Sequence, residues 1–115
     1  MRNFIYKLFR PQEWEAAKKA GEFRGSPDDL RDGFIHFSAA HQVRTTFDKY
    51  FPDQYNPILA AVDASRLGEA LKWEMSRGGE KFPHLYGVLK LSHVRETFEI
   101  RRDASGRPIF PPEIP

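Results

Sequence analysis

Hydrophobic and polar residues alternate at the start of the chain and predict a strand followed by a helix. The alternation runs from Phe4 to Leu8, which is typical of a strand. Pro11 suits the first position of a helix and Gly21 suits its end. A helix is therefore expected from about Gln12 to Ala20.

The next part of the chain changes pattern three times. Residues 22–32 contain Gly, Ser, Pro and three Asp residues without periodicity, so a long surface loop is predicted. A short strand is expected at residues 34–37, and Ser38 stands where a helix N-cap would be, ahead of apolar residues at helical spacing that end before Pro52. The apolar run at residues 57–62 predicts a strand that is buried on both faces and central to the sheet.

The last third of the chain reads as short strands separated by turns. Strands are predicted at 71–75 and 86–91, and a hairpin at 97–101 with 107–110, and residues 111–115 should form an extended tail. The connections are too short for helical crossovers, so we expect an α+β fold with a mostly antiparallel sheet. Two main helices cannot cover both faces of a large sheet. Part of the sheet is therefore expected to be open, or the sheet to be split into two pieces around a cleft.

Composition narrows the class of protein. The 115 residues are enough for a single domain, 1–115, with one core. The absence of Cys excludes disulfides, thiolate zinc sites and a cysteine nucleophile. A net charge of +2 without a basic run is only a weak indication of nucleic-acid binding. There is no signal-like or membrane-length apolar stretch, so a soluble, cytoplasmic protein without a membrane partner is expected.

The segment Gly33–Ser38 holds the first candidate site residues. His36 and Ser38 are two positions apart in an apolar run, so both point to one face of a strand. That face must satisfy them internally or present them to a ligand. Ser38 at the start of a helix could contact a phosphate, which would suit a nucleotide. The alternative is that Ser38 only caps the helix and His36 is a buried histidine bonded to the backbone.

The segment Glu80–Gly87 holds the second group. Two glycines and Pro83 shape a loop that brings Glu80, His84 and Tyr86 together. The Glu80 carboxylate could bind a ribose diol or stabilise a developing cation, and Tyr86 could stack on a base. The alternative is a solvated glutamate, a histidine that caps a turn and a half-buried tyrosine.

Metal and serine chemistry receive little support from the sequence. The four histidines do not have metal-ligand spacing, and no HExxH motif is present, so no metal site is expected. No Gly-x-Ser-x-Gly motif is present either, which argues against a serine hydrolase of that type.

Several segments together resemble a small family of about this length that is known only as a domain of unknown function. The likeness covers residues 3 to about 95, and its most specific marks are Gly33-Phe34-Ile35-His36-Phe37-Ser38 and Phe82-Pro83-His84-Leu85-Tyr86-Gly87. The family is similar in predicted architecture to ADP-ribosyltransferases and to the RNA 2′-phosphotransferases that use NAD. In those enzymes the first strand offers a histidine to the nicotinamide ribose. The matching position here is Lys7, which can meet a phosphate but cannot act as a neutral imidazole.

The resemblance implies an ADP-ribosyltransferase-like fold and a nucleotide cleft. Glu80 would orient the ribose and His36 would contact its hydroxyl or phosphate, which makes these two the expected catalytic residues. The expected ligand-binding residues are Tyr6, Lys7, Ser38, His84 and Tyr86. NAD is the expected substrate, with no other cofactor implied. The alternative is a non-catalytic module that binds a nucleotide or a peptide end. The sequence leaves open both the choice between enzyme and module and the oligomeric state.

Overall fold

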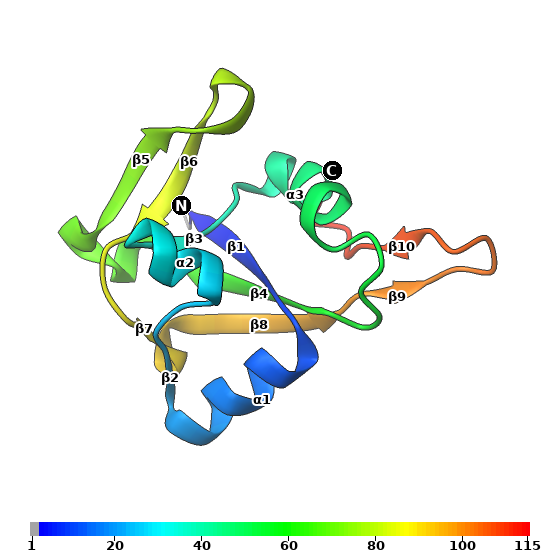
Figure 1. Ribbon diagram of the computed structural model, residues 1–115, viewed down its shortest axis with the longest axis horizontal. Helices are drawn as coiled ribbons and strands as arrows, with labels where there is room; N and C mark the ends of the chain where they lie inside the picture. The colour runs from blue at the N-terminus through cyan, green and yellow to red at the C-terminus, as the bar shows by residue number, and fades with distance from the viewer. Residues whose placement is uncertain (1–2) are drawn as a thin grey trace.

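The computed structural model describes residues 3–115, which form an α+β fold with antiparallel sheets (Figure 1). The α-helices are α1 (Pro11–Ala20), α2 (Pro27–Asp32) and α3 (Val43–Tyr50). The strands are β1 (Phe4–Phe9), β2 (Glu22–Phe23), β3 (Ile35–His36), β4 (Ile58–Asp63), β5 (Leu71–Met75), β6 (Lys81–Leu85), β7 (Leu89–Lys90), β8 (Val94–Glu99), β9 (Arg101–Arg102) and β10 (Pro108–Ile109). Short 3-10 turns η1 (Ala40–Gln42), η2 (Ala64–Arg66), η3 (Gly68–Ala70), η4 (Arg77–Gly79) and η5 (Leu91–His93) connect several of them.

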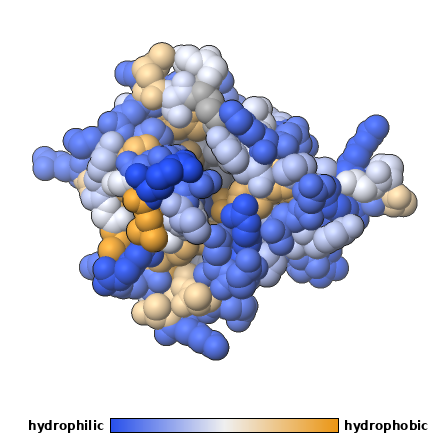
Figure 2. Space-filling model, in the orientation of Figure 1, coloured by the Kyte–Doolittle hydropathy of each residue, from blue (hydrophilic) through white to orange (hydrophobic). Residues whose placement is uncertain are grey.

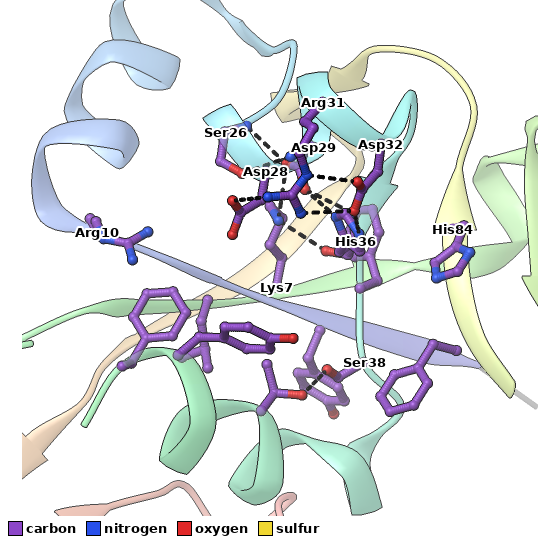
Figure 3. A pocket seen from close by; sticks show the side chains of 17 residues that line it. Lys7, Arg10, Ser26, Asp28, Asp29, Arg31, Asp32, His36, Ser38 and His84 are labelled. Atoms are coloured by element: carbon purple, nitrogen blue, oxygen red, sulfur yellow. Dashed lines mark hydrogen bonds and ion pairs between the residues drawn. The ribbon is translucent and has the colours of Figure 1, made fainter. Parts of the chain in front are cut away.

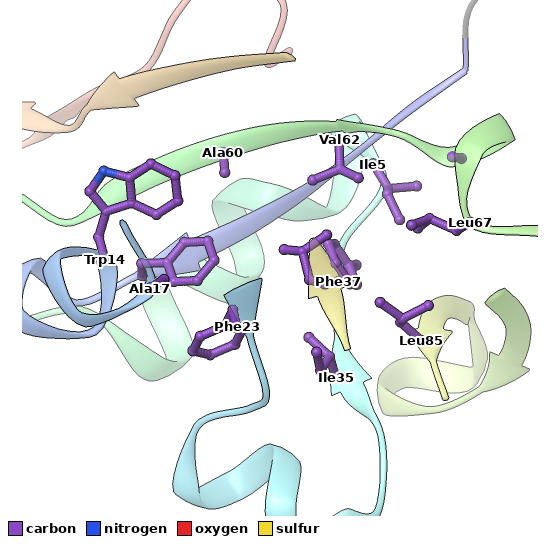
Figure 4. Packing of buried hydrophobic residues seen from close by; sticks show 13 residues of the cluster. Ile5, Trp14, Ala17, Phe23, Ile35, Phe37, Ala60, Val62, Leu67 and Leu85 are labelled. Carbon is purple, nitrogen blue, oxygen red and sulfur yellow. The ribbon is translucent and has the colours of Figure 1, made fainter. Parts of the chain in front are cut away.

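The first sheet has the order β1-β4-β8, so the apolar β4 is its central strand, as its sequence predicts. Every residue of β1 pairs with β4, for example Leu8 with Leu59. Alternation along β1 divides the side chains between the two faces. Ile5 and Phe9 belong to a core with α1, whereas Tyr6 and Leu8 belong to a core with α3. Figure 4 shows the first of these cores.

The second sheet has the order β3-β6-β5 and extends beside the first (Figure 1). The two sheets meet at one bridge, where Tyr6 and Ser38 exchange backbone hydrogen bonds of 2.8 Å. The prediction of an antiparallel α+β fold is therefore confirmed, and the strands are divided between separate sheets. The likeness to ADP-ribosyltransferases stays a prediction.

The predicted loop at residues 22–32 is wrong, because most of it is regular structure. Residues Glu22–Phe23 pair with β7, and Pro27–Asp32 form α2. Ser26 caps this helix, and Gly33 ends it with a φ of +86°, which favours glycine. A serine, a proline and acidic residues ahead of a glycine are signals for a short helix, and the lack of apolar periodicity concealed them.

Four further predictions differ from the structure. The hairpin expected at 97–101 with 107–110 is limited to Arg101–Arg102 and Pro108–Ile109, because residues 94–99 form β8 and pair with β4. Of the strand expected at 86–91 only Leu89–Lys90 form a strand, β7, and the longer strand is β6 at Lys81–Leu85, whose last four residues are buried. Ser38 is no helix cap: α3 begins at Val43, and the Ser38 hydroxyl contacts the Thr46 hydroxyl at 2.9 Å. The tail, expected to be extended, turns and packs, with Ile114 buried in the α3 core.

Candidate ligand-binding site

A pocket of about 140 Å³ opens between α2, β3 and α3. The face drawn in Figure 2 is hollowed near its centre, with hydrophilic side chains of α2 beside hydrophobic ones. Its charged and imidazole residues are Lys7, Arg10, Asp28, Asp29, Arg31, Asp32, His36 and His84. Its aromatic residues are Tyr6, Phe37, Tyr50, Phe51 and Phe82. Cavities of about 150 Å³ accept a benzene-sized ring, so the enclosed part holds one ring or one sugar.

Helix α2 positions the acidic wall of the pocket. The Ser26 amide donates to the Asp29 carboxylate at 2.9 Å, and the Asp29 amide donates to the Ser26 hydroxyl at 3.2 Å. This reciprocal pair forms a capping box, which fixes the first turn of the helix. A Cβ on Gly25 would approach the Cβ of Asp29 to 3.0 Å, so the chain entering α2 needs a glycine there. The result is a buried Asp29 carboxylate held by its own helix.

Lys7 is the cationic partner of Asp29, and both side chains are buried. The Lys7 Nζ lies 3.3 Å from Asp29 Oδ2 and donates to the carbonyl oxygen of His36 at 2.9 Å. It also lies 5.6–6.0 Å from the ring centres of Phe9, Phe23 and Phe37. Lys7 therefore joins β1 to α2 and β3 through buried charge, besides lining the pocket.

The pKa of Asp29 results from opposing causes. Burial alone would raise it, because a charged carboxylate loses solvation. The hydrogen bond from His36, the charge of Lys7 and the backbone amides of Ser26 and His36 outweigh burial and hold the pKa well below its usual range. Asp29 is therefore an anion in the folded protein.

The His36 imidazole lies between two carboxylates, as Figure 3 shows. Its Nδ1 is 2.6 Å from Asp29 Oδ1, and its Nε2 is 2.9 Å from Asp32 Oδ2. Each contact requires an N–H on the ring, so the imidazolium form satisfies both. Asp32 also accepts from Arg31, at 2.9 Å from Nε and 3.3 Å from the terminal Nη2. The Arg31 hydrogen bond, with burial opposing it, lowers the pKa of Asp32.

His84 lies on the other side of the pocket from Arg10 (Figure 3) and pairs with His36 across β3 and β6. The two imidazole rings are on one face of the sheet, with centres 5.6 Å apart. The Nδ1 of His84 is 2.8 Å from a Glu74 oxygen that also accepts from the Tyr86 hydroxyl at 2.7 Å. Hydrogen bonds from His84 and Tyr86 lower the pKa of Glu74. The Phe34 ring stacks on His84 with centres 3.9 Å apart.

The structure brings together most of the predicted site residues. Those that line the pocket are Tyr6, Lys7, His36, Ser38 and His84. Tyr6 is buried, and this burial, with the charges of Glu113 and Glu96, raises its pKa. Tyr86 is outside the pocket lining found among residues 3–115, because its hydroxyl turns to Glu74.

Glu80, the predicted ribose-orienting residue, is also outside this lining. It immediately precedes β6, and its carboxylate accepts from Gln42 at 3.2 Å and contacts His41 Nε2 at 3.1 Å. Gln42 also donates to the carbonyl of Lys81 at 2.9 Å. Glu80 therefore joins the start of β6 to η1, and His36 finds its carboxylates in α2 instead.

Sequence reasoning missed the residues that the loop 22–32 and the first helix supply. Asp29 and Asp32 come from α2, and Arg10 precedes α1. The capping signal at Ser26 would have located α2, and the spacing of Asp32 and His36 would then have suggested proximity. No local pattern marks Arg10, whose guanidinium lies over the Phe51 ring at 4.8 Å.

No cluster of three or more His, Asp or Glu side chains in residues 3–115 could hold a metal ion. None of the helices in this part of the chain is long and apolar enough to cross a membrane.

The chain belongs to the family described as protein of unknown function DUF952, whose model matches residues 8–97. It is similar to the crystal structure of protein CC0527 from Caulobacter crescentus, with 51% identity over 92% of this chain and 93% of that one and a TM-score of 0.87. The solution NMR structure of CC0527 also matches, with 51% identity over 91% and 90% of the two chains and a TM-score of 0.81. No functionally curated protein matches the chain.

Proposed function

We propose that this member of the family binds a ribonucleotide-type ligand in the pocket beside His36, and that ADP-ribose and NAD are the forms to test first. The observation that carries the proposal is the joint presence of cationic, acidic and aromatic side chains around one small cavity. A nucleotide offers a group to each of them: phosphate, ribose hydroxyls and an aromatic base.

Arg10 is the residue best suited to the phosphate. Its side chain is 38% exposed, and its ion pair with Glu13 is long, at 3.8 Å. A guanidinium donates two parallel hydrogen bonds to a phosphate, which a lysine cannot do. Lys7 is less suited, because Asp29 and the His36 carbonyl already hold its ammonium. The sequence suggested Lys7 as the residue that meets a phosphate. The proposal assigns the phosphate to Arg10 instead.

The aromatic wall suits a base or a nicotinamide ring. Tyr50 is 44% exposed, and Phe51 lies beside it under Arg10. Stacking of a base on an aromatic side chain contributes about 1–3 kcal/mol. The hydroxyl of Ser38 lines the same pocket and offers a hydrogen-bond partner to a ribose hydroxyl. The cavity accommodates one such unit at a time, so the rest of a dinucleotide would lie in the open mouth.

Calorimetric titration with ADP-ribose, NAD and adenosine tests the proposal. We expect saturable binding of ADP-ribose and NAD, weaker binding of adenosine, which lacks phosphate, and about tenfold weaker binding of ADP-ribose to Arg10→Gln. Arg101→Gln is the matched control, because Arg101 is an exposed arginine outside the pocket lining. Absence of saturable nucleotide binding, or an equal loss in both variants, would overturn the proposal.

A transferase acting on NAD is the second candidate, and the 2.6 Å contact between His36 and Asp29 favours it. In such a reaction the bond from ribose C1′ to nicotinamide breaks, an acceptor oxygen bonds to C1′, and the acceptor proton passes to a pocket carboxylate. Nicotinamide release that is lost in His36→Gln supports this candidate. Binding without release supports the non-catalytic module, which the absence of Glu80 from the pocket lining also favours.

A further inference from the structure

Asp32 is held as a bound oxyanion would be held. Its Oδ2 lies 2.9 Å from the His36 Nε2, and its two oxygens accept hydrogen bonds from the Arg31 guanidinium at 2.9 and 3.3 Å. An imidazolium and a guanidinium converging on two oxygens is an arrangement that also suits phosphate. Figure 3 shows these three side chains meeting at the wall of the pocket.

The two carboxylates on His36 differ in how firmly they are fixed. Asp29 is 2% exposed and is held by Lys7, Ser26 and the backbone amide of His36. Asp32 is 33% exposed and has partners only in His36 and its chain neighbour Arg31 among the contacts found in residues 3–115. Water screens exposed ion pairs and replaces them at little cost. Asp32 is also the last residue of α2, where a negative charge is unfavourable. Asp32 is therefore the carboxylate that another anion can replace beside His36.

We propose that the Asp32 carboxylate is an internal occupant of an oxyanion subsite, and that a ligand phosphate takes its place on His36 and Arg31 when Asp32 rotates toward solvent. Asp29 stays hydrogen-bonded to the Nδ1 of His36 and keeps the ring oriented. This inference rests on the proposed function, since it concerns the same pocket, and it defines which group of the ligand enters at α2.

Removal of the internal carboxylate should strengthen anion binding. The probe is inorganic phosphate, titrated at about pH 6, where imidazoles are mostly protonated. We expect Asp32→Asn to bind phosphate about tenfold more tightly than the unmodified protein, with a change in the side-chain ¹⁵N signal of His36 Nε2. Asp28→Asn is the matched control, because Asp28 lies on the same helix, lines the same pocket and contacts Arg31 but not His36. It removes the same charge, and we expect less than about a threefold gain.

Equal gains in the two variants would overturn the inference, because they would reflect net charge alone. Phosphate binding without a change at His36, or no phosphate binding to any of the three proteins, would also overturn it. The outcome is separable from that of the proposed function. If ADP-ribose binds equally well to the unmodified protein, Asp32→Asn and Asp28→Asn, the nucleotide pocket stands and the subsite falls. If phosphate behaves as expected but no nucleotide binds more tightly than phosphate, the subsite stands and the nucleotide proposal falls.

Discussion

Two imidazole–carboxylate pairs lie side by side in this protein, and their burial is reversed. In the His36–Asp29 pair the carboxylate is 2% exposed and the imidazole 36% exposed. In the His84–Glu74 pair the imidazole is 5% exposed and the carboxylate 38% exposed. The distances between the paired atoms are similar, at 2.6 and 2.8 Å.

The difference shows that the same contact has two structural roles. A buried carboxylate must have several partners, and Asp29 joins β1, α2 and β3 through Lys7, Ser26 and His36. An exposed carboxylate is solvated, so Glu74 mainly orients His84. The first pair leaves its imidazole partly exposed in the pocket, and the second buries its imidazole against Phe34. The account therefore predicts unequal effects when either pair is changed.

Replacement of Asp29 should have the largest effect. In Asp29→Asn the buried Lys7 ammonium loses its anionic partner, and we expect the free energy of unfolding to fall by about 3–5 kcal/mol. Urea unfolding measures this, with Asp28→Asn as the control on the same helix. A loss below about 1 kcal/mol would contradict the view that Asp29 is a buried anchor.

Acid should destabilise the protein through the same residue. The pKa of Asp29 is lower in the folded protein than in the unfolded chain, so folding favours the ionised form. Its stabilising contribution is complete above the ordinary pKa of aspartate, about 3.9, and is lost as the pH falls through the lower native value. Unfolding followed as a function of pH should show a smaller acid loss in Asp29→Asn than in the unmodified protein. Equal slopes would contradict this explanation.

In the second pair, replacement of the imidazole should lower the free energy of unfolding more than replacement of the carboxylate. His84→Ala removes a buried ring that stacks on Phe34, and we expect a loss of about 2 kcal/mol in the free energy of unfolding. Glu74→Gln should cost no more than about a third of the loss seen in Asp29→Asn, because water solvates the exposed carboxylate. Denaturant titration of the two variants checks this order. A larger loss in Glu74→Gln than in His84→Ala would remove the contrast between the pairs.

A third acid, Glu80, should have the smallest effect on ligand binding. Its carboxylate contacts Gln42 and His41, and its side chain is 56% exposed. Glu80 does not belong to the pocket lining. We expect Glu80→Gln to change the affinity for ADP-ribose by less than about twofold, with Arg10→Gln measured alongside as the sensitive variant. A tenfold loss in Glu80→Gln would restore the role that the sequence assigned to it.

The sequence predicted the elements that have strong periodicity. Alternation at Phe4–Leu8 and the apolar run at 57–62 correspond to β1 and β4, and the helix signals around Pro11 and Gly21 correspond to α1. Helix α2 was missed because it is six residues long and buries only Asp29, so it has no apolar stripe. The strand at Lys81–Leu85 was misplaced because Pro83 and the preceding glycines suggested a loop.

The candidate site could be predicted only in part for the same reason. His36, Ser38 and His84 stand in apolar runs and were recognisable as polar side chains on a strand face. The carboxylates that hold His36 come from the missed helix. Without that helix, Glu80 was the one carboxylate within the segment Glu80–Gly87. Its position in the sequence did not indicate that its carboxylate would bind Gln42 of η1 outside the pocket lining.

Nuclear magnetic resonance of the histidine side chains during an ADP-ribose titration tests the central claim most directly. The account predicts that the imidazole signals of His36 and His84 shift together and saturate with the binding isotherm, because both rings line the pocket. His93, which lies in η5 outside the pocket lining, should not shift. Binding that leaves His36 unchanged, or no binding at all, would contradict the assignment of this pocket to a nucleotide.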